Sequence, residues 1–294
     1  MAQVRRFNRT VTQRVGALED RFLGRGRPLG EARLLWEIGS QGRDVRALRA
    51  DLGLDSGYLS RLLRSLEAAG LVSVRASKAD RRVRVATLTA RGRRERRTLD
   101  RRSDEVADAL LRPLTARQQE RLVVAMAEVE LLLRAGAVEI AEIDPAAEDA
   151  QWCLRSYFAD LDSRFETGFE IARSSQVPVA ELRPPAGVFV VAHLGAEPVG
   201  CGGLRLMDGG ACDVKRMWVA PSARGMGLGR RLLTDLEARA VALGARRLRL
   251  ETNGALVEAI SLYRSAGFTE VAPFNDEAYA HHWFAKPIGP DAVR

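Results

Sequence analysis

The residues of this chain that could do chemistry gather in a loop at residues 224–230. Arg224, Gly225, Gly227 and Gly229 follow a strand-like run and precede an amphipathic helix. Because glycine has no Cβ, the backbone N–H groups of such a loop can turn toward a ligand. The helix that starts behind the loop adds the positive end of its dipole. The pattern predicts a cradle for the pyrophosphate of a nucleotide-type cofactor.

Two familiar phosphate-binding motifs do not fit this loop. A dinucleotide-binding loop has glycines at its first, third and sixth positions, but the sixth position from Gly225 is Arg230. A Walker loop needs Gly-Lys followed by Ser or Thr, which the sequence lacks. The spacing Arg-x-x-Gly-x-Gly at Arg224, Gly227 and Gly229 instead resembles the acetyl-CoA loop of the GNAT N-acetyltransferase family.

A second motif supports the same resemblance. Residues 259–268 read Ala-Ile-Ser-Leu-Tyr-Arg-Ser-Ala-Gly-Phe, which is similar to the family's Leu-Tyr-x-x-x-Gly-Phe signature. The resemblance covers about residues 138–286 and implies a GNAT α/β fold with a mixed central sheet and acetyl-CoA as the cofactor. It places the pantetheine arm on the backbone of Met217 and Val219 and the pyrophosphate on the loop. The expected cofactor-binding residues are Met217, Trp218, Val219, Arg224, Gly225, Met226, Gly227, Leu228, Gly229, Arg230, Asn253 and Tyr263.

Direct acyl transfer to an amine requires a group that takes the amine's proton and a group that helps the thiolate leave. Tyr263 matches the family's thiolate-protonating tyrosine, although it could also be an aromatic ring that packs on the cofactor. Asp213 lies six residues before Val219, where several family members carry a glutamate, and is one candidate base. Glu251 at the end of a strand is the other, and either carboxylate could simply be solvated.

The acceptor is the least constrained part of the reaction. In the GNAT fold the helix at residues 152–162 should lie over the acceptor cleft. Arg155 and Tyr157 in that helix could bind a carboxylate, which would indicate an amino-acid-like amine, or they could be surface residues. Asn253 could bind cofactor or substrate, and it is equally suited to forming a turn.

The first half of the chain has a different charge from the second. Residues 1–136 contain 29 Lys and Arg against 17 Asp and Glu, a net charge of +12, whereas residues 137–294 have a net charge of −4. A genome-wide bias toward arginine would make both halves of the chain equally basic. The asymmetry predicts that residues 1–136 bind a polyanion.

Within the basic half, two short helices are predicted at residues 45–51 and 56–69, with a tight turn at Gly53 between them. Two alternating runs at residues 71–75 and 83–88 predict a hairpin with a basic tip, as in a winged helix. The tip and the segment after it, Asp-Arg-Arg and Leu-Thr-Ala-Arg-Gly, resemble the MarR family of regulators over about residues 13–134. The expected DNA-binding residues are Ser56, Tyr58, Ser60, Arg61, Arg64, Lys78, Arg81 and Arg82.

MarR-like proteins are dimers held by helices at the ends of the domain, so the resemblance implies a homodimer. The candidate helices are residues 8–23, 97–111 and 116–134. A winged helix can also be a protein–protein module, and the apolar residues of these helices could pack on their own domain. The fold class expected is α+β with two domains, a mostly helical winged helix-turn-helix at 1–136 and the GNAT domain at 137–294.

The hydrophobic runs and the cysteines of the sequence bear on where the protein is expected in the cell. No apolar run approaches the ~20 residues of a membrane span. Three scattered cysteines suggest neither a disulfide framework nor a metal site, so a reducing cytoplasm is expected. The sequence therefore predicts a transcription regulator fused to an acetyltransferase that acetylates a small amine. The alternatives are a regulator whose GNAT domain only senses acyl-CoA or a metabolite, and a protein-lysine acetyltransferase.

Overall fold

The computed structural model describes residues 1–14, 22–24, 26–77, 80–174 and 177–289. The chain forms two compact units, residues 1–127 and 128–294, which we describe separately. The division lies inside helix α6 (Ala116–Gly136), whereas the domain boundary expected from the sequence follows the end of that helix. No described helix combines the length and the apolar character needed to cross a membrane.

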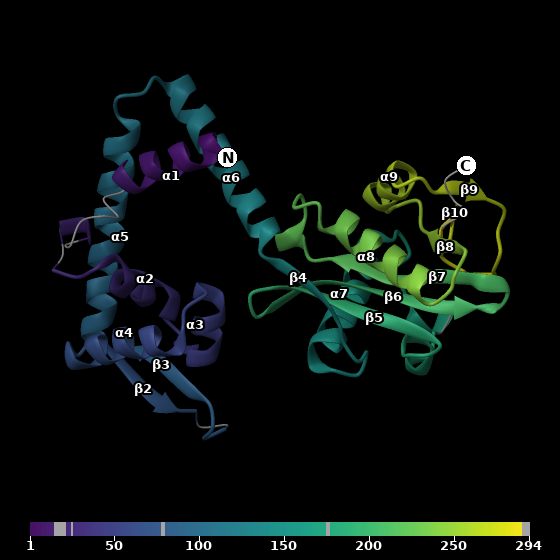
Figure 1. Ribbon diagram of the computed structural model, residues 1–294, viewed down its shortest axis with the longest axis horizontal. Helices are drawn as coiled ribbons and strands as arrows, with labels where there is room; N and C mark the ends of the chain where they lie inside the picture. Colours follow the sequence, from purple (N-terminus) through teal and green to yellow (C-terminus); the bar gives the residue numbers. More distant parts are fainter. Residues whose placement is uncertain (15–21, 25, 78–79, 175–176, 290–294) are drawn as a thin grey trace. The chain divides into compact units, whose positions relative to one another are not determined.

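The first unit is mainly helical and carries a small antiparallel sheet with the strand order β1-β3-β2 (Figure 1). Its helices and strands, in chain order, are α1 (Ala2–Arg14), α2 (Leu29–Ile38), β1 (Arg43–Asp44), α3 (Val45–Leu52), α4 (Ser56–Ala68), β2 (Val72–Ala76), β3 (Arg84–Leu88) and α5 (Ala90–Leu111). Leucines from α2, α3 and α4 meet in its core, together with Leu71 and Leu99. The predicted helix at residues 8–23 corresponds to α1 as far as Arg14, and residues 15–21 lie outside the described part.

Side-chain caps define the two short helices that the sequence predicts. The carboxylate of Asp44 accepts hydrogen bonds from the backbone N–H groups of Arg46 and Ala47 at the start of α3. Gly53 ends α3 in the left-handed conformation at φ 60°, which costs glycine little. Asp55 then caps α4 by accepting from the Tyr58 N–H. The result is a helix-turn-helix that is followed by the β2–β3 hairpin.

The second unit is built on a mixed seven-stranded sheet with the order β4-β5-β6-β7-β8-β10-β9. In the described sheet only β7 and β8 pair in parallel. The strands are β4 (Val138–Glu142), β5 (Gly187–Leu194), β6 (Glu197–Met207), β7 (Ala211–Val219), β8 (Arg247–Thr252), β9 (Thr269–Val271) and β10 (His282–Pro287). The expected fold class, a helical winged helix-turn-helix and a GNAT fold with a mixed sheet, is confirmed.

Helices cover both faces of this sheet. Cys201 of β6 contacts Cys153 of α7 (Glu148–Arg164), whereas an added Cβ at the next residue, Gly202, would meet Leu236 of α8 (Leu228–Ala242). Because successive strand residues point to opposite faces, α7 and α8 lie on opposite sides of the sheet. A third helix, α9 (Val257–Ser265), follows β8.

A bulge in β7 opens the sheet where the site lies. Between the pairs Cys201–Trp218 and Gly203–Lys215 the register shifts, so that Arg216 and Met217 together oppose one residue of β6. Arg216 takes φ 55°, which is uncommon for a residue other than glycine. The pairing of β7 with β8 covers residues 211–213 of β7, on the side of the bulge away from the glycine loop. Beyond that point the two strands diverge and leave room for side chains.

Candidate active site and nucleic-acid interface

Two cavities lie beyond the point where the pairing of β7 with β8 ends. The first, here called the loop cavity, encloses about 410 Å³ and lies against the glycine loop. It is lined by ten of the twelve predicted cofactor residues: Met217, Trp218, Val219, Arg224, Gly225, Gly227, Leu228, Gly229, Arg230 and Tyr263. The structure therefore brings most of the predicted cofactor set together around one space.

The backbone of the loop explains its glycines. Gly225 and Gly227 have φ values of 81° and 70°, and Gly227 is the residue before the first turn of α8. A Cβ at Gly229 would come within 3.2 Å of the Leu262 side chain, so a larger residue there would crowd the cavity. Gly225 and Gly227 thus adopt a positive φ, which favours glycine, and Gly229 leaves no room for a larger side chain.

Arginines hold the ends of the loop in place. Arg224 donates to the Val219 carbonyl at 3.2 Å and pairs with Asp160 of α7 at 2.8 Å. Arg230 donates to the Ser265 carbonyl at 3.1 Å. Arg164 also lines the loop cavity, but Arg164 and Arg224 pair with the lining carboxylates of Glu258 and Asp160. The charged side chains among the described lining residues therefore sum to +1, a small positive balance that suits an anionic ligand.

Two predicted cofactor residues have other positions. Met226 is buried in the core of the second unit and is not among the described residues that line either cavity. Asn253 lines the second cavity, where its amide donates to the Tyr279 carbonyl at 2.8 Å and its oxygen accepts from the Ala255 N–H at 2.9 Å. Both ends of the Asn253 side chain therefore hold the backbone after β8, as a turn-forming asparagine does.

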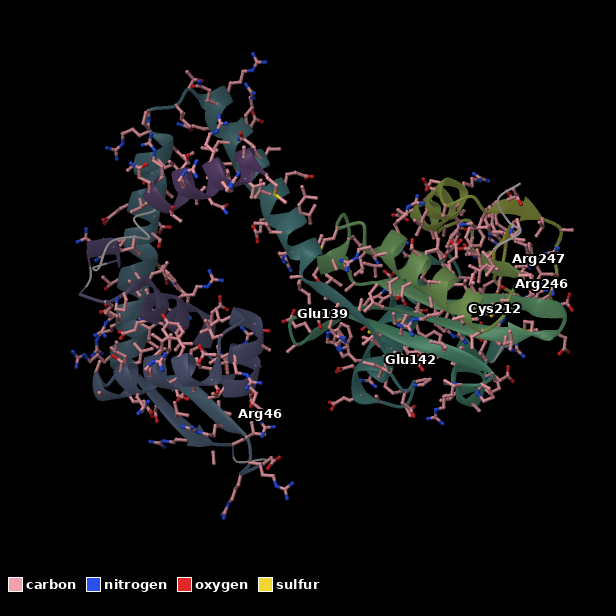
Figure 2. The ribbon with its side chains drawn as sticks, viewed as in Figure 1. Arg46, Glu139, Glu142, Cys212, Arg246 and Arg247 are labelled. Atoms are coloured by element: carbon pink, nitrogen blue, oxygen red, sulfur yellow. The ribbon has the colours of Figure 1, made fainter. Side chains whose placement is uncertain are left out.

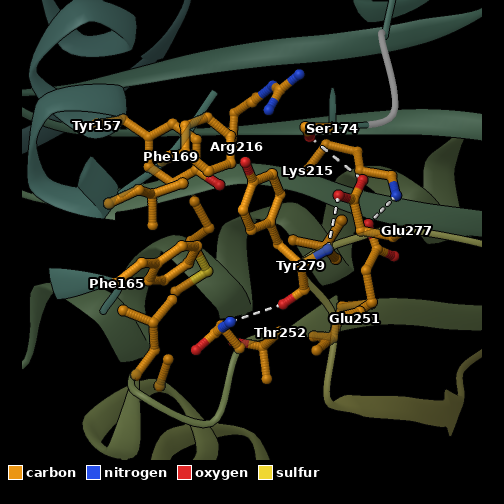
Figure 3. A pocket seen from close by; sticks show the side chains of 18 of the residues that line it. Tyr157, Phe165, Phe169, Ser174, Lys215, Arg216, Glu251, Thr252, Glu277 and Tyr279 are labelled. Carbon is orange, nitrogen blue, oxygen red and sulfur yellow. Dashed lines mark hydrogen bonds and ion pairs between the residues drawn. The ribbon is translucent and has the colours of Figure 1, made fainter. Parts of the chain in front are cut away.

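The second cavity, here called the polar cavity, encloses about 110 Å³ between the end of α7, β7, β8 and the segment before β10 (Figure 3). Six residues line both cavities: Tyr157, Leu161, Met217, Leu256, Ala259 and Tyr263. The two spaces therefore meet at these residues. A donor in one cavity and an acceptor in the other could come into contact there.

Two tyrosines lie at this meeting point. Burial raises the pKa of the Tyr263 hydroxyl, and the nearby Tyr157 and Glu251 raise it further. Burial also raises the pKa of Tyr157 to about 12, with Arg216 acting in the opposite direction. Both phenols therefore stay protonated near neutral pH and can donate hydrogen bonds.

The two carboxylate candidates have different surroundings. Glu251 lines the polar cavity, forms a buried ion pair with Lys215, and accepts from the Asn275 amide at 3.4 Å. Asp213 is only 3% exposed, pairs with Arg249 at 2.9 Å, and is not among the described residues that line either cavity. Asp213 lies where β7 and β8 are still paired, so the structure keeps it away from the opening and leaves Glu251 beside it.

Of the two predicted substrate residues, only one lines the cavities. Tyr157 lines both cavities, whereas Arg155 is exposed and is not among the described lining residues. Two positions apart on a helix are about 200° apart, so only one can face the cleft. Charged residues that the sequence analysis did not single out are Lys215, Arg216 and Glu277. The alternation of β7 could have indicated Lys215, but the positive φ of Arg216 has no sequence signal.

The predicted DNA-binding residues lie on α4 and the hairpin of the first unit. Leu59, Leu62, Leu63 and Leu66 face the core, and the other side of α4 is exposed. The exposed residues among the predicted set are Ser56, Tyr58, Ser60, Arg61, Arg64, Arg81 and Arg82, and Lys78 lies outside the described residues. Arg46 of α3, labelled in Figure 2, is a further exposed arginine.

A local hydrogen bond lies next to the hairpin tip, among its described residues. Asp80 accepts from the Arg82 N–H at 2.8 Å, so it holds the turn that carries Arg81 and Arg82. On α4 the Arg61 guanidinium lies 5.7 Å from the centroid of the Tyr58 ring. The helix and the hairpin therefore both present arginines to solvent.

Both halves of the chain are similar to known protein families. The acetyltransferase (GNAT) family model matches residues 146–268, and the MarR family model matches residues 25–83. The IAA acetyltransferase of Azospirillum brasilense is 41% identical over 113 residues, which are 38% of this chain and 67% of the relative. An uncharacterized N-acetyltransferase of Escherichia coli, YjgM, is 33% identical over 122 residues, 40% of this chain and 73% of the relative.

Solved structures also match the second unit. A GNAT-family acetyltransferase from Staphylococcus aureus has a TM-score of 0.46 at 18% identity and covers 52% of this chain and 100% of its own. An acyl-CoA N-acyltransferase from Klebsiella pneumoniae has a TM-score of 0.42 at 26% identity, covering 52% and 98%.

The family matches place the second unit among the N-acyltransferases that use an acyl-CoA donor. The chain belongs to the GNAT acetyltransferase family, and a MarR-family segment precedes the acetyltransferase in the same chain. Both resemblances drawn from the sequence are confirmed.

Proposed function

We propose that the second unit transfers an acetyl group from acetyl-CoA to a small amine, and that the first unit binds duplex DNA. The observation that carries the acetyltransferase proposal is the meeting of the loop cavity and the polar cavity at Met217 and Tyr263. The positive-φ glycines and the nearby guanidinium groups fit a pyrophosphate at the loop.

The residues at the meeting point supply the functions that acyl transfer needs. Acetyl-CoA, when bound, provides a thioester as the acyl donor. Glu251 would take the proton of the acceptor amine, directly or through water. Tyr263 would donate a hydrogen bond to the leaving thiolate, because burial keeps its hydroxyl protonated. The backbone N–H of Met217, at the bulge, would stabilise the developing oxyanion.

The raised pKa limits what Tyr263 can do. A free thiol has a pKa of about 8.5 and an ordinary tyrosine about 10, so full proton transfer from tyrosine to thiolate is already uphill. Burial makes it more so. Tyr263 therefore acts as a hydrogen-bond donor in the transition state, and the proton can reach the sulfur later from solvent.

The direct test is CoA release by the full chain from acetyl-CoA across a panel of primary amines, measured with a thiol reagent. We expect turnover with at least one small amine, and a loss of turnover in Glu251→Gln. Asp213→Asn is the matched control, because its carboxylate is buried against Arg249 outside the cavities. If the parent protein binds acetyl-CoA but turns over none of the amines, the GNAT unit is a sensor and the enzymatic proposal is wrong.

The DNA-binding proposal depends on the exposed arginines of α4 and the hairpin and on the +12 charge of residues 1–136. Positively charged residues on a helix and a wing suit the major groove and the flanking phosphates. A homodimer would present two such surfaces to a symmetric site. Fluorescence anisotropy with duplex DNA tests this directly.

A further inference from the structure

We propose that Asn275 is a positioning residue for the acetyl transfer: its amide orients the carboxylate of Glu251, and the indole N–H of Trp283 fixes the amide. This inference rests on the proposed acetyltransferase function and adds two residues that act from behind the site. Neither Asn275 nor Trp283 is among the described residues that line the two cavities, whereas Glu251 lines the polar cavity.

The carboxylate of Glu251 is held through both of its oxygens. Oε1 accepts from the ammonium of Lys215 on β7, and the two form an ion pair in which both side chains are at least nine-tenths buried (Figure 3). Oε2 accepts from the Asn275 amide at 3.4 Å. The terminal torsion of a glutamate has a broad energy minimum, so a carboxylate without such contacts can turn. Two contacts from different segments restrict this rotation.

The amide of Asn275 supplies the direction that the ion pair lacks. The Lys215 ammonium is a compact charge with three rotatable donors on a flexible stem, so it attracts the carboxylate but sets its plane only weakly. An amide is planar, and its donors and its acceptor lie at fixed positions in that plane. The orientation of the Glu251 carboxylate therefore depends on where the Asn275 amide is held.

Trp283 determines which end of the amide faces Glu251. The indole Nε1 of Trp283 donates to Asn275 Oδ1 at 2.8 Å. An indole N–H can only donate and an ionised carboxylate can only accept. The amide oxygen must therefore face the indole and the amide nitrogen must face the carboxylate, because a flipped amide would place two acceptors together and two donors together.

The sheet places Trp283 beside Glu251. Trp283 of β10 lies directly opposite Glu251 of β8 in the antiparallel pair. Side chains at opposite positions of such a pair project from the same face, so the indole and the carboxylate are neighbours. Asn275 comes from the segment between β9 and β10 and bridges the two side chains. This chain of hydrogen bonds is thus anchored on two paired strands.

In the transfer the amine nitrogen forms a bond to the acetyl carbon and the carbon–sulfur bond breaks. The amine proton goes to Glu251, directly or through water, and the thiolate leaves with a hydrogen bond from Tyr263. Asn275 takes no part in these bond changes. It holds the accepting oxygen of Glu251 toward the amine, where a displacement of about 1 Å can cost roughly a hundredfold in rate. Its loss should therefore lower kcat and leave binding nearly unchanged.

The experiment measures kcat and KM of the full chain with acetyl-CoA and the primary amine that gives the highest kcat/KM in the panel. We expect Asn275→Ala to lower kcat by roughly ten- to hundredfold, while both KM values and the calorimetric affinity for acetyl-CoA stay within about threefold. Asn275→Asp keeps the shape and the acceptor for the indole but has no amide donor, so it should lose as much at about pH 8, where an aspartate is ionised. Asp276→Ala is the matched control, because Asp276 is the exposed neighbour in the same segment.

A double-mutant cycle with Trp283 distinguishes positioning from a loss of packing. Trp283→Phe keeps a ring and removes the N–H, so kcat should fall, and adding it to Asn275→Ala should cause no further fall. The inference is overturned if Asn275→Ala and Asn275→Asp keep the kcat of the parent, if Trp283→Phe does so, or if the two losses multiply in the double variant. An active parent with an inactive Glu251→Gln variant confines such a result to this inference. A parent that turns over no amine overturns the proposed function as well.

Discussion

At the scale of single residues, the proposed role of the Tyr263 hydroxyl in the chemical step can be tested by removing it. Tyr263→Phe keeps the ring that packs near Phe268 and Phe284 and removes only the hydroxyl. We expect kcat to fall by roughly 10²-fold, while acetyl-CoA affinity stays within a few-fold, because the hydrogen bond is made in the transition state. Stopped-flow or steady-state turnover together with calorimetry measures both quantities. Turnover equal to that of the parent would remove Tyr263 from the mechanism.

The pH dependence of the reaction follows from the same residue. An ordinary tyrosine loses its proton at about pH 10. Burial raises the pKa of Tyr263 and takes that of Tyr157 to about 12, so the neutral, hydrogen-bond-donating form persists to higher pH. We expect kcat to rise with deprotonation of the acceptor and to show no falling limb below about pH 10.5. A falling limb near pH 10 that disappears in Tyr263→Phe would contradict the assigned pKa direction.

At the scale of elements, the proposed anion site is formed by the glycine loop and the start of α8. Gly229→Asp would put a carboxylate against Leu262 in the loop cavity and beside the cofactor's pyrophosphate. We expect acetyl-CoA affinity to fall by at least about a hundredfold through crowding and charge repulsion. Gly136→Asp is the control, since Gly136 ends α6, is exposed, has no positive φ, and has nothing within 4 Å of an added Cβ. If calorimetry shows that Gly229→Asp leaves the affinity for acetyl-CoA unchanged, the cofactor does not bind at this loop.

We expect substitutions in the helix-turn-helix and in the hairpin to change DNA binding in different ways. Arg82→Ala in the hairpin should weaken binding to all sequences and reduce the salt slope by about 0.9 per lost phosphate contact. Arg61→Ala on α4 should also reduce the preference for the specific site. Arg33→Ala on α2, whose guanidinium is exposed and pairs with Glu37 at 2.6 Å, is the matched control. Anisotropy at several salt concentrations measures the slopes, and a chain that binds no duplex at ~50 mM salt would not be a DNA-binding regulator.

At the scale of the whole molecule, exposed apolar residues on α6 indicate a partner. The apolar side chains of Val123, Val124, Met126, Leu132 and Leu133 are exposed. With the MarR-family match at residues 25–83, this favours a homodimer. We expect light scattering to give twice the monomer mass, and Val124→Glu with Met126→Glu to shift the protein to monomers and weaken DNA binding. A stable monomer in the parent protein at micromolar concentration would contradict the dimer.

The sequence alone was sufficient for most of the elements and for the backbone conformation of the glycine loop. The two short helices α3 and α4 end within one residue of their predicted ranges, because capping residues such as Asp44, Asp55 and Gly53 act on the backbone next to them. The starts of α1 and α5 were predicted wrongly, since these helices begin at Ala2 and Ala90 rather than at residues 8 and 97. The glycine loop could be read for the same reason, since positive φ at Gly225 and Gly227 is a local requirement. Both family resemblances depended on such contiguous motifs.

Only the tertiary structure decided which charged side chains share the site. Asp213 and Glu251 were both candidate bases in the sequence, but the pairing of β7 with β8 ends at Asp213 and the polar cavity lies beyond it, at Glu251. Arg155 and Tyr157 were likewise both candidate substrate-binding residues in the sequence. The orientation of α7 on the sheet turns Tyr157 toward the cavities and leaves Arg155 exposed. Local backbone preferences act between neighbours in the chain. The meeting of two cavities depends on strands and helices that pack across long separations, and no short sequence pattern encodes that packing.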